Sequence, residues 1–378
     1  MKKKVLSLLM AGAMVTTMFA GCGVESSDST ESGSSSKKSG DVQVGIVLPT
    51  KDEPRWLQDQ EQFESKLKEA GFKSQVLFSQ GSSATEKTNV ETLISQGIDV
   101  LIICAQDASA AAAAVEEAKD AGVTVIAYDR LITGTDAVDY YVTFDSFSVG
   151  EAQGQYLIDN TTGTDVPLYL YAGAATDNNA FIFFEGAWSV LQPKIADGTY
   201  KIANSDVAEK YKDKAELTRD EESEIIGQIT TDWDFNVAKS KAEAHLTAVG
   251  NDMKGDVAIL GPNDGTARSI ADVFSTDSAI SKYIITGQDS EVASVQYIID
   301  GKQSMTVFKD TRTLAADSVD MAVSVLDGKT PETDTTYNNE NKDVPAKQTD
   351  IVVVTKDNVK EALIDSGYYE ASEFTGLD

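Results

Sequence analysis

Short apolar runs alternate with amphipathic stretches along the chain from residue 41 onward. The amphipathic stretches predict helices, among them 55–70, 83–96 and 107–121, each followed by a glycine. Such alternation is typical of β-α-β units with a parallel sheet. The apolar runs predict strands at 42–48, 76–78, 100–104, 124–128, 140–144, 168–171, 257–260, 284–286, 305–308 and 351–354. Because one open parallel sheet rarely holds so many strands, we predict two α/β lobes.

Two polar segments interrupt the alternation. Residues 204–224 carry mixed charges, which favours a solvated loop or an exposed helix. Residues 330–348 are polar and rich in turn residues, so they predict a surface excursion before the last strand.

The N-terminus has the pattern of a processing segment. Three lysines follow Met1, and an uncharged apolar stretch, too short to span a bilayer, runs to Phe19. The stretch ends in Ala20-Gly21-Cys22, which resembles the lipobox of bacterial lipoproteins. We therefore expect residues 1–22 to be a lipoprotein signal with Cys22 lipidated, which would anchor the protein to the extracytoplasmic face of the cell membrane. The alternative is an ordinary signal peptide with a chance cysteine at its end.

Residues 23–40 follow the signal, and eight of these 18 residues are serine. Such a segment lacks the apolar side chains needed for a core, so it predicts a flexible tether.

Composition excludes several classes of function. The chain of 378 residues has 61 acidic and 32 basic side chains, a formal charge of −29 that repels nucleic acids and anionic lipids. Two cysteines and one histidine are too few for a disulfide framework or a typical zinc site. We therefore expect no nucleic-acid partner, no metal and no cofactor.

Polar and aromatic side chains follow most of the predicted strands. In an open α/β sheet, ligands bind beyond the carboxyl ends of the strands, so these residues are candidates for a site. They are Arg55, Trp56, Gln106, Asp107, Asp129, Arg130, Asp177, Asn178, Asn179, Asn263, Asp264, Gln288, Asp289 and Lys309.

This mixture of side chains suits a neutral sugar. Each sugar hydroxyl both donates and accepts hydrogen bonds, and leaving one unpartnered costs about 1–3 kcal/mol, so such a pocket needs carboxylates, amides and cations together. A flat indole such as Trp56 suits the apolar face of a pyranose. Structural roles remain open: Asp107, Asn178 and Asp289 could cap helices, Trp56 could belong to the core, and Arg130 could form a structural ion pair.

Several sequence strings resemble the xylose-binding and multiple-sugar-binding branch of the periplasmic solute-binding proteins. The resemblance covers residues 42–369. The strings are Arg55-Trp56, Tyr128-Asp129-Arg130-Leu131-Ile132, Asp139-Tyr140-Tyr141-Val142-Thr143-Phe144-Asp145, Asp177-Asn178-Asn179-Ala180, Gly287-Gln288-Asp289 and Phe308-Lys309-Asp310-Thr311-Arg312.

The resemblance implies a type I solute-binding fold, in which two doubly wound parallel-sheet lobes are joined by three crossovers, here near Asp145, Asp289 and Lys309. It implies an N-terminal lobe of residues 41–145 and about 290–307, and a C-terminal lobe of residues 146–289 and about 308–378.

It also implies a ligand-binding set. Trp233 is in this set from the resemblance alone, and it would sandwich the pyranose ring with Trp56. The full set is Arg55, Trp56, Asp129, Arg130, Asn178, Trp233, Asn263, Asp264, Asp289 and Lys309.

We therefore expect a monomeric, non-enzymatic receptor that binds an aldopyranose such as xylose, glucose, galactose or arabinose and delivers it to an ABC permease. A sensor that presents its sugar to a chemoreceptor or sensor kinase has the same sequence features. A glycoside-processing enzyme is a rival, because carboxylates are abundant. A transcription regulator is a further rival, but it would need a basic helix-turn-helix at the N-terminus. Residues 1–40 instead predict a signal and a tether.

Overall fold

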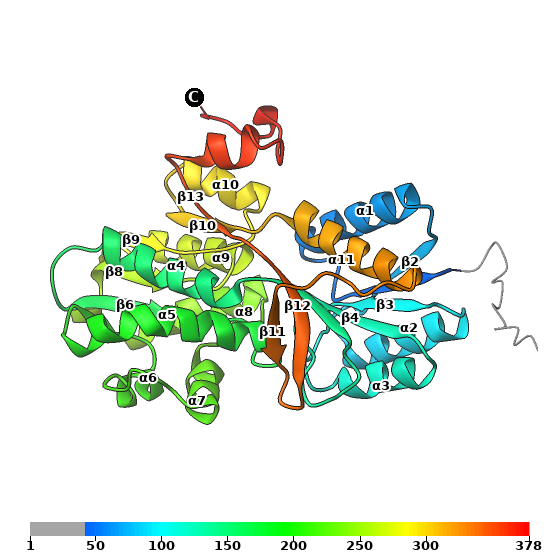
Figure 1. Cartoon of the computed structure of the whole chain (residues 1–378). Coiled ribbons are helices and arrows are strands. Elements are labelled where there is room, and N and C mark those ends of the chain that lie inside the picture. Colours follow the sequence, from blue (N-terminus) through cyan, green and yellow to red (C-terminus); the bar gives the residue numbers. More distant parts are fainter. Residues whose placement is uncertain (1–41, 378) are drawn as a thin grey trace, which may run out of the picture. The chain divides into compact units, whose positions relative to one another are not determined.

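The computed structural model describes residues 42–377, which form three β-sheets with helices packed against them (Figure 1). The predicted signal peptide, the lipidated Cys22 and the tether lie outside the described residues. No helix within 42–377 is long and apolar enough to cross a membrane.

The first lobe is built on a seven-stranded sheet of order β11-β12-β5-β4-β3-β1-β2. All neighbours are parallel except β11 and β12, and the order 2-1-3-4-5 is that of a doubly wound sheet. The strands are β1 (Val44–Leu48), β2 (Ser74–Phe78), β3 (Val100–Ile103), β4 (Thr124–Tyr128), β5 (Tyr140–Phe144), β11 (Thr335–Asn338) and β12 (Asp343–Thr349).

Helices bury both faces of this sheet. Apolar side chains of α2 (Ser83–Ser95) and α3 (Ala112–Asp120) form the core on one face. Those of α1 (Pro54–Glu69) and α11 (Thr311–Leu326) form it on the other. Burial on both faces explains why the central strands read as continuous apolar runs.

The second lobe contains a parallel four-stranded sheet of order β7-β6-β8-β9. One face packs on α5 (Asn178–Ala196) and α7 (Arg219–Ile229), and the other on α8 (Phe235–Ala248) and α9 (Asp264–Thr276). The other elements are β6 (Val166–Leu170), β7 (Tyr200–Ile202), β8 (Gly255–Leu260), β9 (Ile280–Ile285), α4 (Ser146–Asn160), α6 (Asp206–Lys210) and the 3-10 turn η1 (Asn251–Met253).

A small antiparallel sheet of β10 (Met305–Phe308) and β13 (Val352–Thr355) belongs to this second lobe. Met305 and Val307 pack against Val149 of α4. A separate core joins the small sheet to α10 (Val292–Ile299) and to the last elements, η2 (Lys360–Ile364) and η3 (Ala371–Glu373). Figure 1 shows β10, β13 and α10 beside β9 and α4.

The predicted two doubly wound lobes and three crossings are confirmed, but the expected division of the C-terminal half is wrong. Residues 290–307 pack in the second lobe, whereas 311–349 supply α11, β11 and β12 to the first. The crossings lie near Asp145, Lys309 and Asp350, and the loop at Asp289 stays within the second lobe. The apolar pattern of a strand reports its burial and does not identify the sheet that it joins.

The expected surface excursion at 330–348 is also wrong. This segment forms β11 and β12, and β12 pairs in parallel with β5. Only Val344 and Ala346 of this segment join the buried core, so neither the edge strand β11 nor β12 beside it has an apolar run to reveal it. Residues 204–224 contain α6 and the start of α7, in line with the expected exposed helix.

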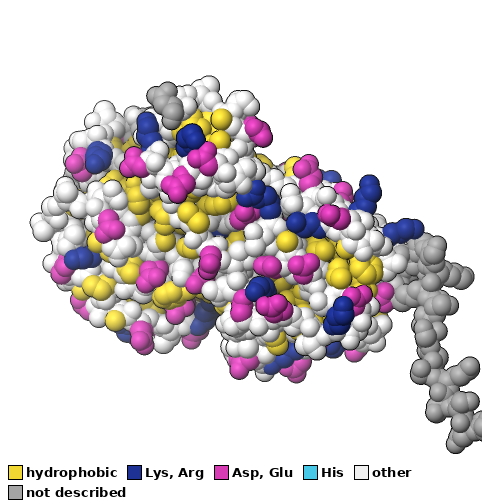
Figure 2. Space-filling model, turned by 45° about the horizontal axis from the view of Figure 1, so that its top comes forward, with side chains coloured by type: hydrophobic (Ala, Val, Ile, Leu, Met, Phe, Trp, Pro, Cys, Tyr) yellow, Lys and Arg dark blue, Asp and Glu magenta, His cyan; other side chains and the backbone are white. Residues whose placement is uncertain are grey.

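The acidic excess is distributed over the surface. Acidic and basic side chains are interspersed on the face that Figure 2 shows. Exposed lysines pair with neighbouring carboxylates, as Lys87 does with Glu91 at 2.6 Å. Such exposed pairs contribute little stability, at most about 1 kcal/mol each.

Candidate ligand-binding site

A pocket lies at the carboxyl ends of the parallel strands, where loops of both lobes meet. The first lobe contributes residues that follow β1 and β4, and the second contributes residues that follow β6, β8 and β9. The space measures about 300 Å³, including its opening to solvent. It is lined by Glu53, Arg55, Trp56, Asp129, Arg130, Asp177, Asn179, Phe183, Trp233, Asn263, Gln288, Asp289 and Lys309.

Arg55 and Trp56 form one wall of the pocket at the start of α1. Pro54 opens this helix, a position where proline costs nothing because its missing N–H has no helical partner. The guanidinium carbon of Arg55 lies 4.4 Å from the Trp56 ring centroid, and that of Arg130 lies 5.4 Å from it. This wall therefore combines a flat apolar surface with hydrogen-bond donors.

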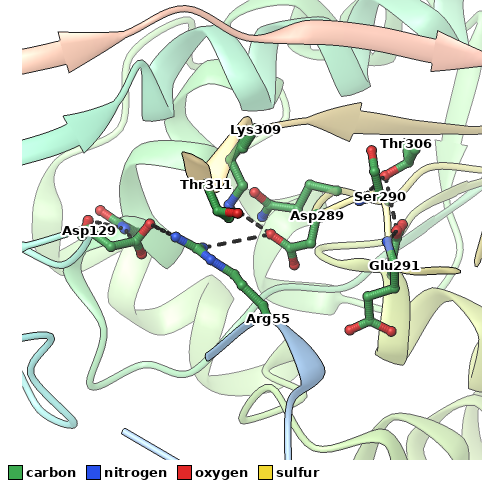
Figure 3. A network of polar contacts seen from close by, with 12 residues as sticks. Arg55, Asp129, Asp289, Ser290, Glu291, Thr306, Lys309 and Thr311 are labelled. Atoms are coloured by element: carbon green, nitrogen blue, oxygen red, sulfur yellow. Dashed lines mark hydrogen bonds and ion pairs between the residues drawn. The ribbon is translucent and has the colours of Figure 1, made fainter. Parts of the chain in front are cut away.

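Ion pairs join pocket residues within the first lobe, and another joins Lys309 at a crossing to Asp289 of the second lobe. Arg55 Nη2 lies 2.5 Å from Asp129 Oδ2, and Lys309 Nζ lies 2.8 Å from Asp289 Oδ1. A longer contact of 3.8 Å joins Arg55 Nη1 to Asp289 Oδ1. Figure 3 shows Arg55 between the two carboxylates, with Lys309 above and reaching the same oxygen of Asp289. Asp289 therefore links the two cations.

The backbone adopts left-handed conformations where it presents two of these carboxylates. Asp129 has φ 62°, Asp289 has φ 97° and Ser290 has φ 51°. Hydrogen bonds hold the strained positions: Asp129 N donates to Val142 O at 2.8 Å, and Asp289 N donates to Val307 O at 3.0 Å. Such strain concentrates at functional sites.

On the second lobe, Asp177 joins two pocket residues. Its Oδ2 lies 3.0 Å from Arg130 Nε and accepts a hydrogen bond from Trp233 Nε1 at 3.1 Å. The indole of Trp233 packs directly on Gly173, where an added Cβ would lie 1.9 Å from the ring. Glycine at 173 is therefore required for this placement of Trp233.

The pocket is close to electrically neutral. Each of its three cations has one carboxylate within 3.0 Å, as described above. Burial raises the pKa of the fourth carboxyl, Glu53, to about 7 and also raises the pKa of Asp177. Burial acts in the same direction on Asp129, but Arg55 and Lys309 outweigh it and lower its pKa. A balanced set of donors and acceptors favours an uncharged, hydroxyl-rich ligand.

The structure brings eight of the ten candidate residues together around this pocket. Asn263 reaches it while its Oδ1 caps α9 by accepting from Thr266 N. Trp56 and Trp233 both line the pocket. That the two indoles sandwich a sugar ring stays a prediction. The eight are Arg55, Trp56, Asp129, Arg130, Trp233, Asn263, Asp289 and Lys309.

Two candidates do not line the pocket. Asn178 Oδ1 accepts from Arg219 Nη2 at 3.0 Å on the outer side of α5. Asp264 is fully buried, where it accepts from Gln303 Nε2 at 2.7 Å and from Thr306 Oγ1 at 3.1 Å, so it ties α9 to β10. In both cases the neighbouring residue, Asn179 or Asn263, faces the pocket.

Five lining residues were absent from the predicted set: Glu53, Asp177, Asn179, Phe183 and Gln288. Three of them, Asp177, Asn179 and Gln288, follow predicted strands and were therefore among the wider set of candidates. The choice between Asn178 and Asn179 depends on helix geometry. Glu53 follows β1, as Arg55 does, but was not chosen, and Phe183 leaves no such signal because it lies inside the apolar α5.

A buried carboxyl lies behind the pocket. Asp59 of α1 has no exposed surface, and its Oδ2 lies 3.7 Å from Arg55 Nε. Burial raises its pKa from 3.8 to about 7, although Arg55 opposes the shift and Asp129 adds to it.

This carboxyl makes stability depend on pH. Between pH 3.8 and about 7, the folded state keeps the Asp59 proton that the unfolded state has released, so this contribution to stability declines as the pH rises. Asp59→Asn cannot titrate, and we expect a smaller fall in the free energy of unfolding between about pH 5 and about pH 8, measured with urea. The exposed control Asp327→Asn should follow the wild type, and identical pH dependence in all three proteins would contradict the assignment.

Within residues 42–377, no group of three or more His, Cys, Asp or Glu side chains is arranged to hold a metal ion. Cys104 is buried in the apolar core beyond β3, where burial raises the pKa of its thiol.

Comparison with known proteins identifies the family. Residues 44–330 match the family described as periplasmic binding protein domain. The multiple sugar-binding periplasmic protein SbpA of Azospirillum brasilense is 37% identical over 340 residues, 88% of this chain and 90% of that protein. The D-xylose-binding periplasmic protein of Escherichia coli (strain K12) is 32% identical over 333 residues, 88% of this chain and 92% of that protein.

Solved structures share the fold. A carbohydrate transporter solute binding protein from Chloroflexus aurantiacus, crystallised in complex with D-glucose, is 64% identical, with a TM-score of 0.88 over 89% of this chain and 99% of that one. Sequence and fold agree over most of the chain, and the protein therefore belongs to the periplasmic binding protein domain family.

Proposed function

We propose that the protein captures one neutral monosaccharide, an aldopyranose, between its two lobes. The observation that carries this proposal is the pairing of every pocket cation with a carboxylate, beside two indoles. Paired cations and carboxylates can donate to and accept from vicinal hydroxyls without favouring a charged ligand. Trp56 and Trp233 would cover the two faces of the sugar ring.

The relatives support this class of ligand. SbpA is named for multiple sugars, the Escherichia coli protein for D-xylose, and the Chloroflexus aurantiacus protein was solved with D-glucose. D-Glucose is the first candidate, because that relative shares 64% of its sequence with this chain.

Closure of the lobes would be the mechanism. The chain crosses between the lobes near Asp145, Lys309 and Asp350, and a sugar bonded to both sides would stabilise the closed state by its greater affinity for that state. An ABC permease would then recognise the closed lobes and receive the sugar unchanged. The same closed surface could also be presented to a chemoreceptor or a sensor kinase.

Isothermal titration with D-glucose, D-galactose, D-xylose and L-arabinose tests this function. We expect at least one sugar to bind with a Kd of about 1 μM or tighter, which corresponds to about −8 kcal/mol. The bound sugar should be recovered chemically unchanged, and chromogenic glycosides should not be hydrolysed. Absence of binding by all four sugars, or turnover of a glycoside, would contradict the proposal.

We propose that the protein acts on the extracytoplasmic side of the membrane, as its family does, and is anchored there by acyl chains on Cys22. In cells, Cys22→Ser should move the protein from the membrane fraction to the soluble extracytoplasmic fraction. Ser26→Ala, in the predicted tether, is the control and should leave it in the membrane fraction. Retention of the Cys22 variant on the membrane would rule out this anchor.

A further inference from the structure

A second, larger cavity adjoins the pocket. It encloses about 1120 Å³, including its opening to solvent, and shares Glu53, Arg130 and Trp233 with the first pocket. The two spaces are therefore adjacent, with these three side chains at their boundary.

The walls of this second cavity carry groups that suit another sugar ring. Phe235, the first residue of α8, is 51% exposed, although phenylalanine is ordinarily buried. Its ring offers a flat apolar surface two residues beyond Trp233. Within residues 42–377, the side-chain amides of Gln106 and Asn236 form no hydrogen bond with another protein group, so both are available to hydroxyls.

The charges in the second cavity favour an uncharged ring. Asp52, Asp232 and Asp234 line it together with Glu53, and Arg130 is the one cation among its lining residues. The guanidinium of Arg130 is already engaged with Asp177 and with the carbonyl oxygen of Ala105. A phosphate or carboxylate on the second ring would therefore meet uncompensated negative charge.

We propose that this cavity is a second subsite, which accommodates the second ring of a neutral disaccharide whose terminal pyranose occupies the first pocket. The inference rests on the proposed function. The glycosidic bond would pass between Glu53 and Trp233, and the outer ring would stack on Phe235 with its hydroxyls bonded to Gln106 and Asn236.

Separate titrations of the protein with D-glucose and with its disaccharides maltose, cellobiose and trehalose test the subsite. Each disaccharide is first freed of contaminating glucose. At least one disaccharide should bind with a Kd within tenfold of that of D-glucose. Phe235→Ala should raise the Kd of that disaccharide at least fivefold and leave the Kd of D-glucose within twofold. The control Phe147→Ala removes another exposed aromatic ring, on α4 and outside both cavities, and should change neither Kd.

The outcomes separate the two proposals. If monosaccharides bind but every disaccharide has a Kd more than tenfold above that of D-glucose, the subsite is wrong and the proposed function stands. The subsite is equally wrong if Phe235→Ala changes the Kd of the disaccharide less than fivefold, or shifts both Kd values together. Failure of all monosaccharides to bind overturns the proposed function and the subsite with it.

Discussion

Asp289→Asn is expected to weaken D-glucose binding at least a hundredfold, which corresponds to about 2.7 kcal/mol. The carboxylate of Asp289 holds Lys309 Nζ at 2.8 Å and approaches Arg55 Nη1 at 3.8 Å. Asparagine keeps the shape of the side chain and tolerates the left-handed backbone at this position. It leaves Lys309, which is only 4% exposed, without its charge partner and removes an acceptor for sugar hydroxyls.

Isothermal titration measures this effect, and thermal unfolding verifies that the variant is folded. Asp327→Asn is the matched control, because Asp327 is an exposed carboxylate that pairs with Lys329 at 2.9 Å away from the pocket. The control should bind D-glucose within twofold of the wild type. A change of less than threefold in Asp289→Asn would show that this carboxylate does not contact the sugar.

Gly150→Ala is expected to destabilise the second lobe by about 3 kcal/mol. α4 and α5 approach closely at this glycine: an added Cβ would lie 1.8 Å from Phe183 O and 2.9 Å from Ala187 N. Both contacts are with backbone atoms, so the helices must separate. The strain outweighs the gain of about 1 kcal/mol that alanine brings to a helix interior. Because Phe183 lines the pocket, D-glucose binding should weaken as well.

Thermal unfolding should show Tm lowered by about 6 °C, at about 2 °C per kcal/mol. Gly227→Ala in α7 is the matched control, since an added Cβ there would meet nothing within 4 Å. We expect this control to keep or slightly raise the wild-type Tm, by relief of the helix penalty of glycine. An unchanged Tm in Gly150→Ala would mean that α4 and α5 can separate without cost.

Strands with an apolar run could be predicted from the sequence, whereas strands without one could not. β4, β5 and β10 have the predicted bounds, because each is a short run of apolar residues and threonine that ends before a charged residue. β11 and β12 were missed, because the edge strand β11 and its neighbour β12 contribute few apolar side chains to the core. Pairing with β5, 205 residues earlier in the chain, makes β12 a strand.

Most of the candidate site could also be predicted, and its errors share one cause. Arg55, Asp129 and Asp289 were found because side chains that follow parallel strands meet at one edge of the sheet. The pattern does not show which of two neighbouring side chains turns inward: Asn178 was chosen where Asn179 faces the pocket, and Asp264 where the side chain supports β10.

The sequence by itself determined the alternation of strands and helices, the class of side chain that follows each strand, and the acidic balance that excludes nucleic acids. These properties depend on residues close together in the chain, whose period reports which face is buried. Only the tertiary structure decided which lobe each C-terminal segment completes, and that each pocket cation pairs with one carboxylate. Arg55 and Asp129 are 74 positions apart and Arg130 and Asp177 are 47 apart, while Lys309 at a crossing meets Asp289 in a strained loop of the second lobe. The tertiary fold, and not local periodicity, therefore brings these pairs together.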